Sequence, residues 1–244
     1  MLRHDFRACL FRRRRRTGSI RGASMSRPRR FDLVVFDWDG TLFDSTELIA
    51  RCIQNACADV GTAVPSDRDA SFVIGLGLVD ALRHAAPQLA PERYPELAAR
   101  YRHHYSASQH AVLLFEGTLE MLQGLKARRH RLGVATGKTR RGLDDALRAS
   151  QLRHLFDATR TADETAGKPD PRMLLELMAE LGVAPARTLM IGDTTHDLLL
   201  ASNAGAASVG VSYGAHDHAS FAEFGPKHVA HSVAELDGWL AENG

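Results

Sequence analysis

Short apolar runs and amphipathic segments alternate along the chain from residue 117 onward. Continuous apolar runs are typical of buried strands, whereas apolar residues three and four positions apart are typical of helices. The predicted strands are 31–36, 131–135, 188–191 and 207–211, with a weaker one at 156–159. The predicted helices are 119–127, 141–149, 171–181 and 197–204. This alternation indicates an α/β fold, a doubly wound (Rossmann-like) parallel sheet with helices on both faces.

Residues 47–112 interrupt this alternation. They have the spacing of several helices and no clear strand, and prolines at positions 65, 87, 91 and 95 separate the helical stretches. The spacing of Asp44 and Glu47 predicts a capping box at the start of the first helix, which ends at Gly61. We therefore expect an α/β core formed by residues 31–46 and 113–244, with a helical insert, a cap domain, over residues 47–112.

The composition is that of a globular protein. Of the 244 residues, 44% are hydrophobic and 25% are charged, so the chain can bury a full core. No stretch approaches the roughly 18 consecutive apolar residues of a membrane-spanning helix. The three cysteines form no C-x-x-C pair, which argues against a disulfide framework or a zinc site and favours a reducing compartment. We expect a cytoplasmic protein without a membrane partner.

The net charge of +2 is unevenly distributed. Residues 1–24 hold eight arginines and one aspartate, so the remaining chain has 23 basic and 28 acidic residues and a charge of −5. The unbroken run Arg12–Arg16 predicts that the basic tail, residues 1–30, is disordered. This tail is an over-long start before Met25, a basic binding arm or a targeting peptide. We expect no nucleic-acid binding by the folded body.

Acidic residues follow two of the predicted strands. Asp37 and Asp39 come directly after the first strand, and Asp193 and Asp197 follow the strand 188–191. Ligands of open parallel sheets bind beyond the carboxyl ends of the strands, so both groups are expected at one edge. Clustered carboxylates repel one another unless they share a cation, and Mg²⁺ prefers oxygen ligands. Asp37 and Asp193 are therefore candidate Mg²⁺ ligands.

Two further elements suit a phosphate. Thr136 and Gly137 follow the strand 131–135 and offer a hydroxyl and a backbone N–H to a phosphoryl oxygen. Lys168 precedes a helix that Pro171 can start, and its ammonium would place a positive charge beside the transferring group. A single one of these pieces is weak evidence, but four of them in this order are difficult to assign to chance.

The order and identity of these residues resemble the haloacid dehalogenase superfamily. Asp37-x-Asp39-Gly-Thr41 is similar to its first motif, Thr136 to its second, Lys168 to its third, and Asp193 with Asp197 to its fourth. The resemblance covers residues 31 to about 240. The position and helical character of the insert are similar to the cap of phosphoglycolate phosphatase-like members, as is the segment from Ile74 to Pro87.

The resemblance implies a Mg²⁺-dependent phosphatase of small phosphorylated metabolites. Asp37 would attack phosphorus to form an aspartyl-phosphate, and Asp39 would act as general acid and base. Thr136 and Lys168 would complete the catalytic set. The implied metal ligands are Asp37, Asp193 and the backbone carbonyl of Asp39, with Asp197 orienting Lys168 or metal-bound water. The candidate substrate-binding residues are Gly40, Thr41, Gly137, Lys138 and Arg83.

Several functions remain open at this stage. 2-Phosphoglycolate is the default substrate, by analogy with the family alone. A phosphosugar mutase or a pyrophosphatase of the same superfamily is an alternative. From another class, the chain could be a non-catalytic protein that binds nucleic acid through its arginine-rich arm, although it retains every candidate catalytic residue.

Overall fold

A computed structural model describes residues 29–109 and 112–244. Its centre is a six-stranded parallel sheet with the strand order β3-β2-β1-β4-β5-β6. The strands are β1 (Leu33–Phe36), β2 (Arg131–Thr136), β3 (Ala158–Thr161), β4 (Thr188–Gly192), β5 (Ala207–Val211) and β6 (Val229–Ala230). The chain thus begins in the middle of the sheet and builds outward to both sides, which confirms the predicted Rossmann-like α/β fold.

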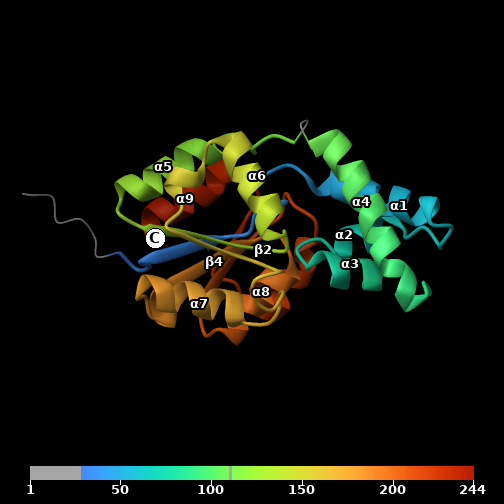
Figure 1. The fold of residues 1–244 in the computed structure, drawn as a ribbon. Helices are drawn as coiled ribbons and strands as arrows, with labels where there is room; N and C mark the ends of the chain where they lie inside the picture. The colour runs from blue at the N-terminus through green and yellow to red at the C-terminus, as the bar shows by residue number, and fades with distance from the viewer. Residues whose placement is uncertain (1–28, 110–111) are drawn as a thin grey trace, which may run out of the picture.

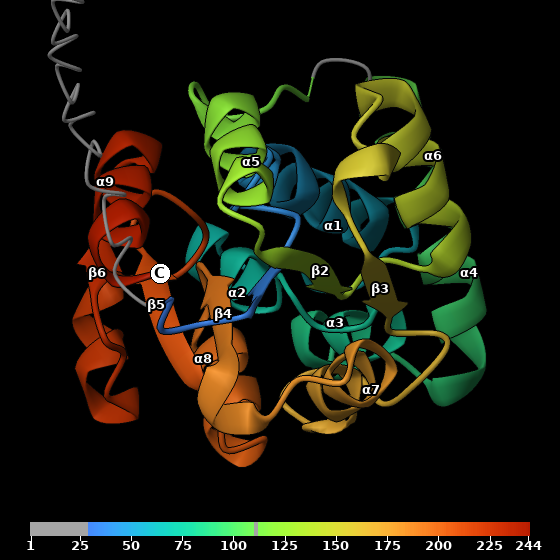
Figure 2. The same cartoon turned by 90° about the vertical axis from the view of Figure 1, so that its left-hand side faces the viewer.

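Helices cover both faces of the sheet (Figures 1 and 2). One face carries α5 (Thr118–Ala127), α6 (Arg140–Ser150) and α9 (Val233–Asn243), and the other carries α7 (Arg172–Leu181) and α8 (Thr195–Asn203). Side chains alternate along a strand, so Val34 and Phe36 pack toward the first layer, while Leu33 and Val35 pack toward the second. Because β1 is buried on both sides, its sequence is a continuous apolar run.

The helical insert, by which we mean the stretch from α1 to α4, stands at one end of the sheet (Figure 1). Its helices are α1 (Thr46–Asp59), α2 (Asp67–Phe72), α3 (Leu78–Ala85) and α4 (Tyr94–Ser108). They share a hydrophobic cluster of their own, which includes Ile53, Leu82 and Leu97. Short 3₁₀ segments occupy Pro91–Arg93, Arg153–Leu155, Pro185–Arg187 and His218–Phe224.

The predicted capping box at Asp44 and Glu47 is wrong. Helix α1 has Ser45 at its N-cap, and no side chain caps it. The Ser45 hydroxyl donates instead to Oδ1 of Asp39, at 2.8 Å. A strong capping pair does form at the start of α8, where Thr194 and Asp197 bond reciprocally.

The basic tail and its arginine run lie outside the described residues. Within the described ranges, none of the helices combines the length and the apolar character that a membrane crossing requires.

Candidate active site

Two central strands bring Asp37 and Asp193 together. Strands β1 and β4 pair in register, with Phe36 opposite Ile191, and the backbone N–H of Asp37 donates to the Ile191 carbonyl at 2.9 Å. Asp37 therefore leaves β1 where Asp193 leaves β4. Both side chains are buried, with relative exposures of 1% and 0%. Residues far apart in sequence thus meet at the carboxyl edge of the sheet, as expected for this fold.

Lys168 joins the acidic group from the segment before α7. Its Nζ lies 2.7 Å from Oδ1 of Asp37 and 2.7 Å from Oδ1 of Asp197, and all three side chains are almost fully buried. Burial lowers the pKa of a lysine, but the charges of Asp197 and Asp37 outweigh it and raise the pKa of Lys168. The ammonium is therefore charged and fixed at the centre of the site.

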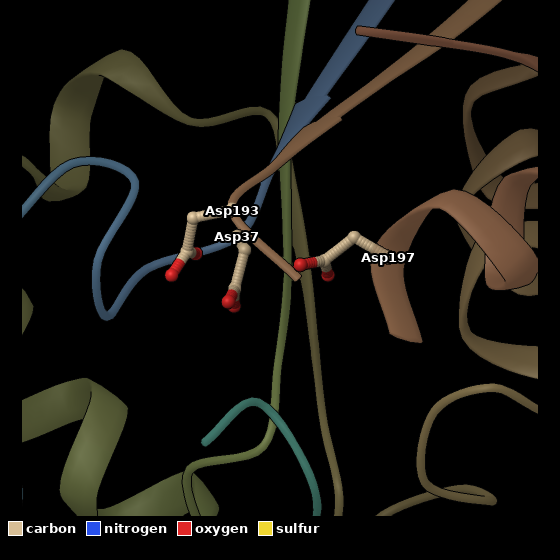
Figure 3. A group of neighbouring side chains, drawn as sticks. All are labelled: Asp37, Asp193 and Asp197. Atoms are coloured by element: carbon tan, nitrogen blue, oxygen red, sulfur yellow. The ribbon is translucent and has the colours of Figure 1, made fainter. Parts of the chain in front are cut away.

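The acidic cluster has more negative charge than Lys168 can balance. Oxygens of Asp37, Asp193 and Asp197 lie within 4.8 Å of one another, and Figure 3 shows the three carboxylates turned toward a common space. When ionised, they and the single ammonium leave a formal charge of −2. Among the described residues, none donates a hydrogen bond to the buried Oδ2 of Asp37. An all-oxygen donor set with this charge and a free buried oxygen fits a hard divalent cation.

Burial and crowding raise the pKa values of Asp37 and Asp193. Burial raises the pKa of Asp37 well above its usual value; Lys168 opposes this, and Asp197 and Asp193 add to it. Burial, followed by repulsion from Asp197, raises the pKa of Asp193 to about 7. A divalent cation would favour the ionised form of both groups.

Asp193 is held in place from two sides. Its Oδ1 accepts from the Thr41 hydroxyl at 2.8 Å, and its Oδ2 accepts from the Ala215 backbone N–H at 2.8 Å. Gly40, at φ 77°, allows this packing because a Cβ there would meet Oδ2 of Asp193 at 2.1 Å. Asp197 is similarly committed, since its Oδ2 accepts from the backbone N–H and hydroxyl of Thr194.

Asp39 lies beside this cluster and contacts different partners. Its Oδ1 accepts from the Ser45 hydroxyl, and its Oδ2 lies 3.0 Å from Nζ of Lys138. Lys138 also donates to the Tyr105 hydroxyl of α4 at 2.9 Å. Despite burial, the charge of Asp39 raises the pKa of Lys138, with Tyr105 acting in the same direction. The Lys138 ammonium thus stays charged in a largely enclosed position, with side-chain exposures of 11% for Lys138 and 12% for Asp39.

A cavity of about 620 Å³ lies over these residues, between the core and the helical insert. Asp37, Asp39, Thr136, Gly137 and Lys138 line its core side. Gly137 is required for close approach of the insert, because a Cβ there would meet the Leu76 carbonyl oxygen at 2.3 Å. The structure thus brings the candidate residues of the four motifs close to one another, with Lys138 beside them.

Arg83 is the candidate that the structure does not bring to the site. It lies on α3 with its side chain 62% exposed, 3.5 Å from Asp80, and it is not among the residues that line the cavity. Its helix presents Ala81 and Leu82 to the interior, so the turn geometry directs position 83 outward. We find no structural support for a role of Arg83 in substrate binding.

Ser45 and Tyr105 were missed by the sequence interpretation. Ser45 follows Asp44, whose spacing from Glu47 matches the sequence pattern of a helix cap. Tyr105 belongs to an aromatic pair with Tyr101, and the two ring centroids lie 5.9 Å apart. Periodicity would assign both to ordinary helix positions. The proximity of Ser45 to the Asp37-x-Asp39 motif was the one available signal.

Comparison with known proteins gives the family. A family model described as haloacid dehalogenase-like hydrolase matches residues 34–211. The chain is 35% identical, over 211 residues, to a Dickeya dadantii protein named probable phosphatase IndB, with 84% of this chain and 92% of that protein covered. It is 31% identical to pyrophosphatase PpaX of Halalkalibacterium halodurans, with coverages of 83% and 94%.

Solved structures agree with the sequence relatives. A crystal structure described as a predicted phosphoglycolate phosphatase from Haemophilus somnus has a TM-score of 0.76 and 27% identity, over 85% of this chain and 96% of that one. The chain therefore belongs to the haloacid dehalogenase-like hydrolase family, and the resemblance of its motifs to that superfamily is confirmed.

Proposed function

We propose that this hydrolase is a Mg²⁺-dependent phosphatase that cleaves phosphate monoesters through an aspartyl-phosphate on Asp37. The observation that carries the proposal is the buried Asp37 carboxylate at the edge of the cavity, with Lys168 on Oδ1 and no hydrogen-bond donor to Oδ2 among the described residues. A carboxylate nucleophile needs neighbouring positive charge to approach a phosphate dianion. The names of the relatives, phosphatase and pyrophosphatase, support the same class of reaction.

The proposed reaction has two steps, in which Asp37 is the nucleophile and Asp39 transfers protons. Asp37 attacks phosphorus and the P–O bond to the alcohol breaks, with Asp39 giving the leaving oxygen a proton. Asp39 then takes a proton from the water that attacks the aspartyl-phosphate, which releases phosphate and restores Asp37. Lys168 and the Thr136 hydroxyl hold the phosphoryl oxygens.

The proposed metal site uses Asp37, Asp193 and the backbone carbonyl of Asp39. Bound Mg²⁺ would neutralise phosphate charge and the excess charge of the cluster. Asp197, whose two oxygens are taken by Lys168 and Thr194, would position the lysine. The helical insert would act as a cap that excludes water from the site during phosphoryl transfer.

The proposal is tested by phosphate release from a panel of esters, including 2-phosphoglycolate, and from pyrophosphate. Turnover should need Mg²⁺, disappear with a chelator and return when Mg²⁺ is added back. Asp37→Asn should abolish turnover and leave the circular dichroism spectrum unchanged. Substantial hydrolysis by the variant, or turnover that is indifferent to the metal, would refute the assignment. Phosphate transfer to a bound sugar phosphate in preference to water would favour the mutase.

A further inference from the structure

The helical insert contacts the core on two sides. On one side, the Tyr105 hydroxyl accepts from Nζ of Lys138 at 2.9 Å. On the other, the Phe72 carbonyl lies 2.9 Å from Nε2 of both His196 and His216. The cavity of about 620 Å³ is therefore the space that remains while the insert is seated on the core.

This volume is large for a two-carbon acid. Cavities of roughly 300–1,000 Å³ take ligands of drug size. A phosphoryl group held by Lys168 and Thr136 would occupy the end of the cavity near Asp37, and most of the space would remain for the alcohol part of the ester.

One wall of the cavity is aliphatic. Buried branched side chains from α1 and from the segment after α2 line it, with exposures of 2–7%: Ile49, Ile53, Val73 and Ile74. Leu76 and Leu78 extend this wall toward Gly137. An alcohol that reaches the wall exchanges water for a close-packed hydrocarbon surface, which favours apolar groups.

The cavity offers poor conditions for a second anion on the substrate. Among the described lining residues, the permanently charged cations are Lys138, Arg102 and Arg141. Lys138 is already paired with Asp39, Arg102 is exposed, and the Arg141 side chain is 94% exposed at the rim. A carboxylate at the depth of the aliphatic wall would lose its hydration without gaining a partner.

We infer that the preferred substrate is the phosphate monoester of an apolar alcohol, larger than the two-carbon skeleton of 2-phosphoglycolate. This inference rests on the proposed phosphatase activity and specifies what the site selects. The aliphatic wall binds the hydrocarbon part, and the acidic cluster with Lys168 processes the phosphate.

The test is a series of substrates assayed with the full chain and Mg²⁺: ethyl, butyl and hexyl phosphate, hexyl phosphate with a terminal carboxylate, and 2-phosphoglycolate. We expect kcat/KM to rise roughly two- to fourfold for each methylene that the wall covers. The terminal carboxylate should reverse this gain. A kcat/KM that is flat or falls with chain length, or that is highest for 2-phosphoglycolate, would overturn the inference while leaving the phosphatase proposal intact.

A variant with a new cation in the wall should gain relative activity toward 2-phosphoglycolate, and misfolding cannot produce such a gain. Leu78→Lys places an ammonium in the aliphatic wall and should shift the ratio of kcat/KM toward 2-phosphoglycolate by about tenfold. Its matched control is Val79→Lys, on the same helix, because Val79 is 49% exposed and does not line the cavity. If the kcat/KM ratio shifts equally in both variants, the aliphatic wall does not contact the alcohol part of the substrate. Absence of turnover with every ester would instead refute the proposed function, and this inference with it.

Discussion

Lys138 and Asp39 form an ion pair, with Nζ and Oδ2 3.0 Å apart, that the helical insert completes. The completing group is the Tyr105 hydroxyl on α4, to which Lys138 donates. The insert is thus linked by one side chain to the proposed acid and base of the reaction. The position of the insert and the orientation of Asp39 both depend on the contact between Tyr105 and Lys138.

The first prediction concerns Tyr105→Phe. The change removes an acceptor from a buried ammonium, and hydrogen bonds to charged groups contribute about 1.5–3 kcal/mol. We expect urea unfolding to show a loss near the lower end of that range, because Tyr105 is only half-buried. The control is Tyr94→Phe, whose hydroxyl donates to the Ala86 carbonyl inside the insert. It should lose about 1 kcal/mol and keep its kcat. If Tyr105→Phe and Tyr94→Phe have equal kcat values, the Tyr105 hydroxyl does not influence the function of Asp39.

The second prediction concerns Asp39→Asn, which cannot donate a carboxyl proton to a leaving alkoxide. Phosphorylation of the enzyme by an alkyl phosphate, followed in single turnover, should slow by roughly 10²–10⁴-fold. The same step with 4-nitrophenyl phosphate should slow much less, because nitrophenolate leaves without a proton. Asp145→Asn, at an exposed site on the cavity rim, is the control. An equal loss for both esters would remove the acid role from Asp39.

The third prediction separates the tail from catalysis. Deletion of residues 1–24 should leave phosphatase turnover unchanged, because every proposed catalytic group lies between residues 37 and 197. Any affinity for nucleic acid should disappear with the tail, together with its dependence on salt. Loss of turnover on deletion would show that the arginine-rich arm has a part in the site.

Much of the core and its acidic edge could be predicted because the signals are local. The apolar run before Asp37 and the one before Asp193 each mark a buried strand, and the carboxyl edge of a parallel sheet gathers the residues that come directly after its strands. The two residues of β6 and the helix α9 were too short or too close to the terminus to stand out.

The interface between insert and core could not be predicted in the same way. Tyr105 reaches Lys138 only because α4 packs along α1 and crosses the cavity, and helical periodicity does not encode that crossing. Arg83 illustrates the opposite failure, since a cation in the right segment lies on the outer face of α3. Ser45 illustrates a competition, in which a residue at an N-cap position donates to a catalytic candidate instead of capping its helix.

The fourth prediction concerns the crowded carboxylates in metal-free protein. The pKa of Asp193 is about 7 in the fold and has an ordinary value of 3.8, so the folded state binds more protons between these limits. Its contribution to stability is therefore complete below about pH 4 and is lost as the pH rises through 7. The difference corresponds to roughly 4 kcal/mol as an upper bound.

In a chelator, the free energy of unfolding should fall as the pH rises from about 4 to 8. Asp193→Asn should flatten this decline, because an amide neither titrates nor repels Asp37 and Asp197. Asp80→Asn, at a 59% exposed side chain on α3, should leave it unchanged. Saturating Mg²⁺ should raise the stability of the wild-type chain most at high pH, where the cation no longer competes with protons. A stability profile in chelator that stays level from pH 4 to 8 would mean that burial and repulsion from Asp197 do not raise the pKa of Asp193 in the fold.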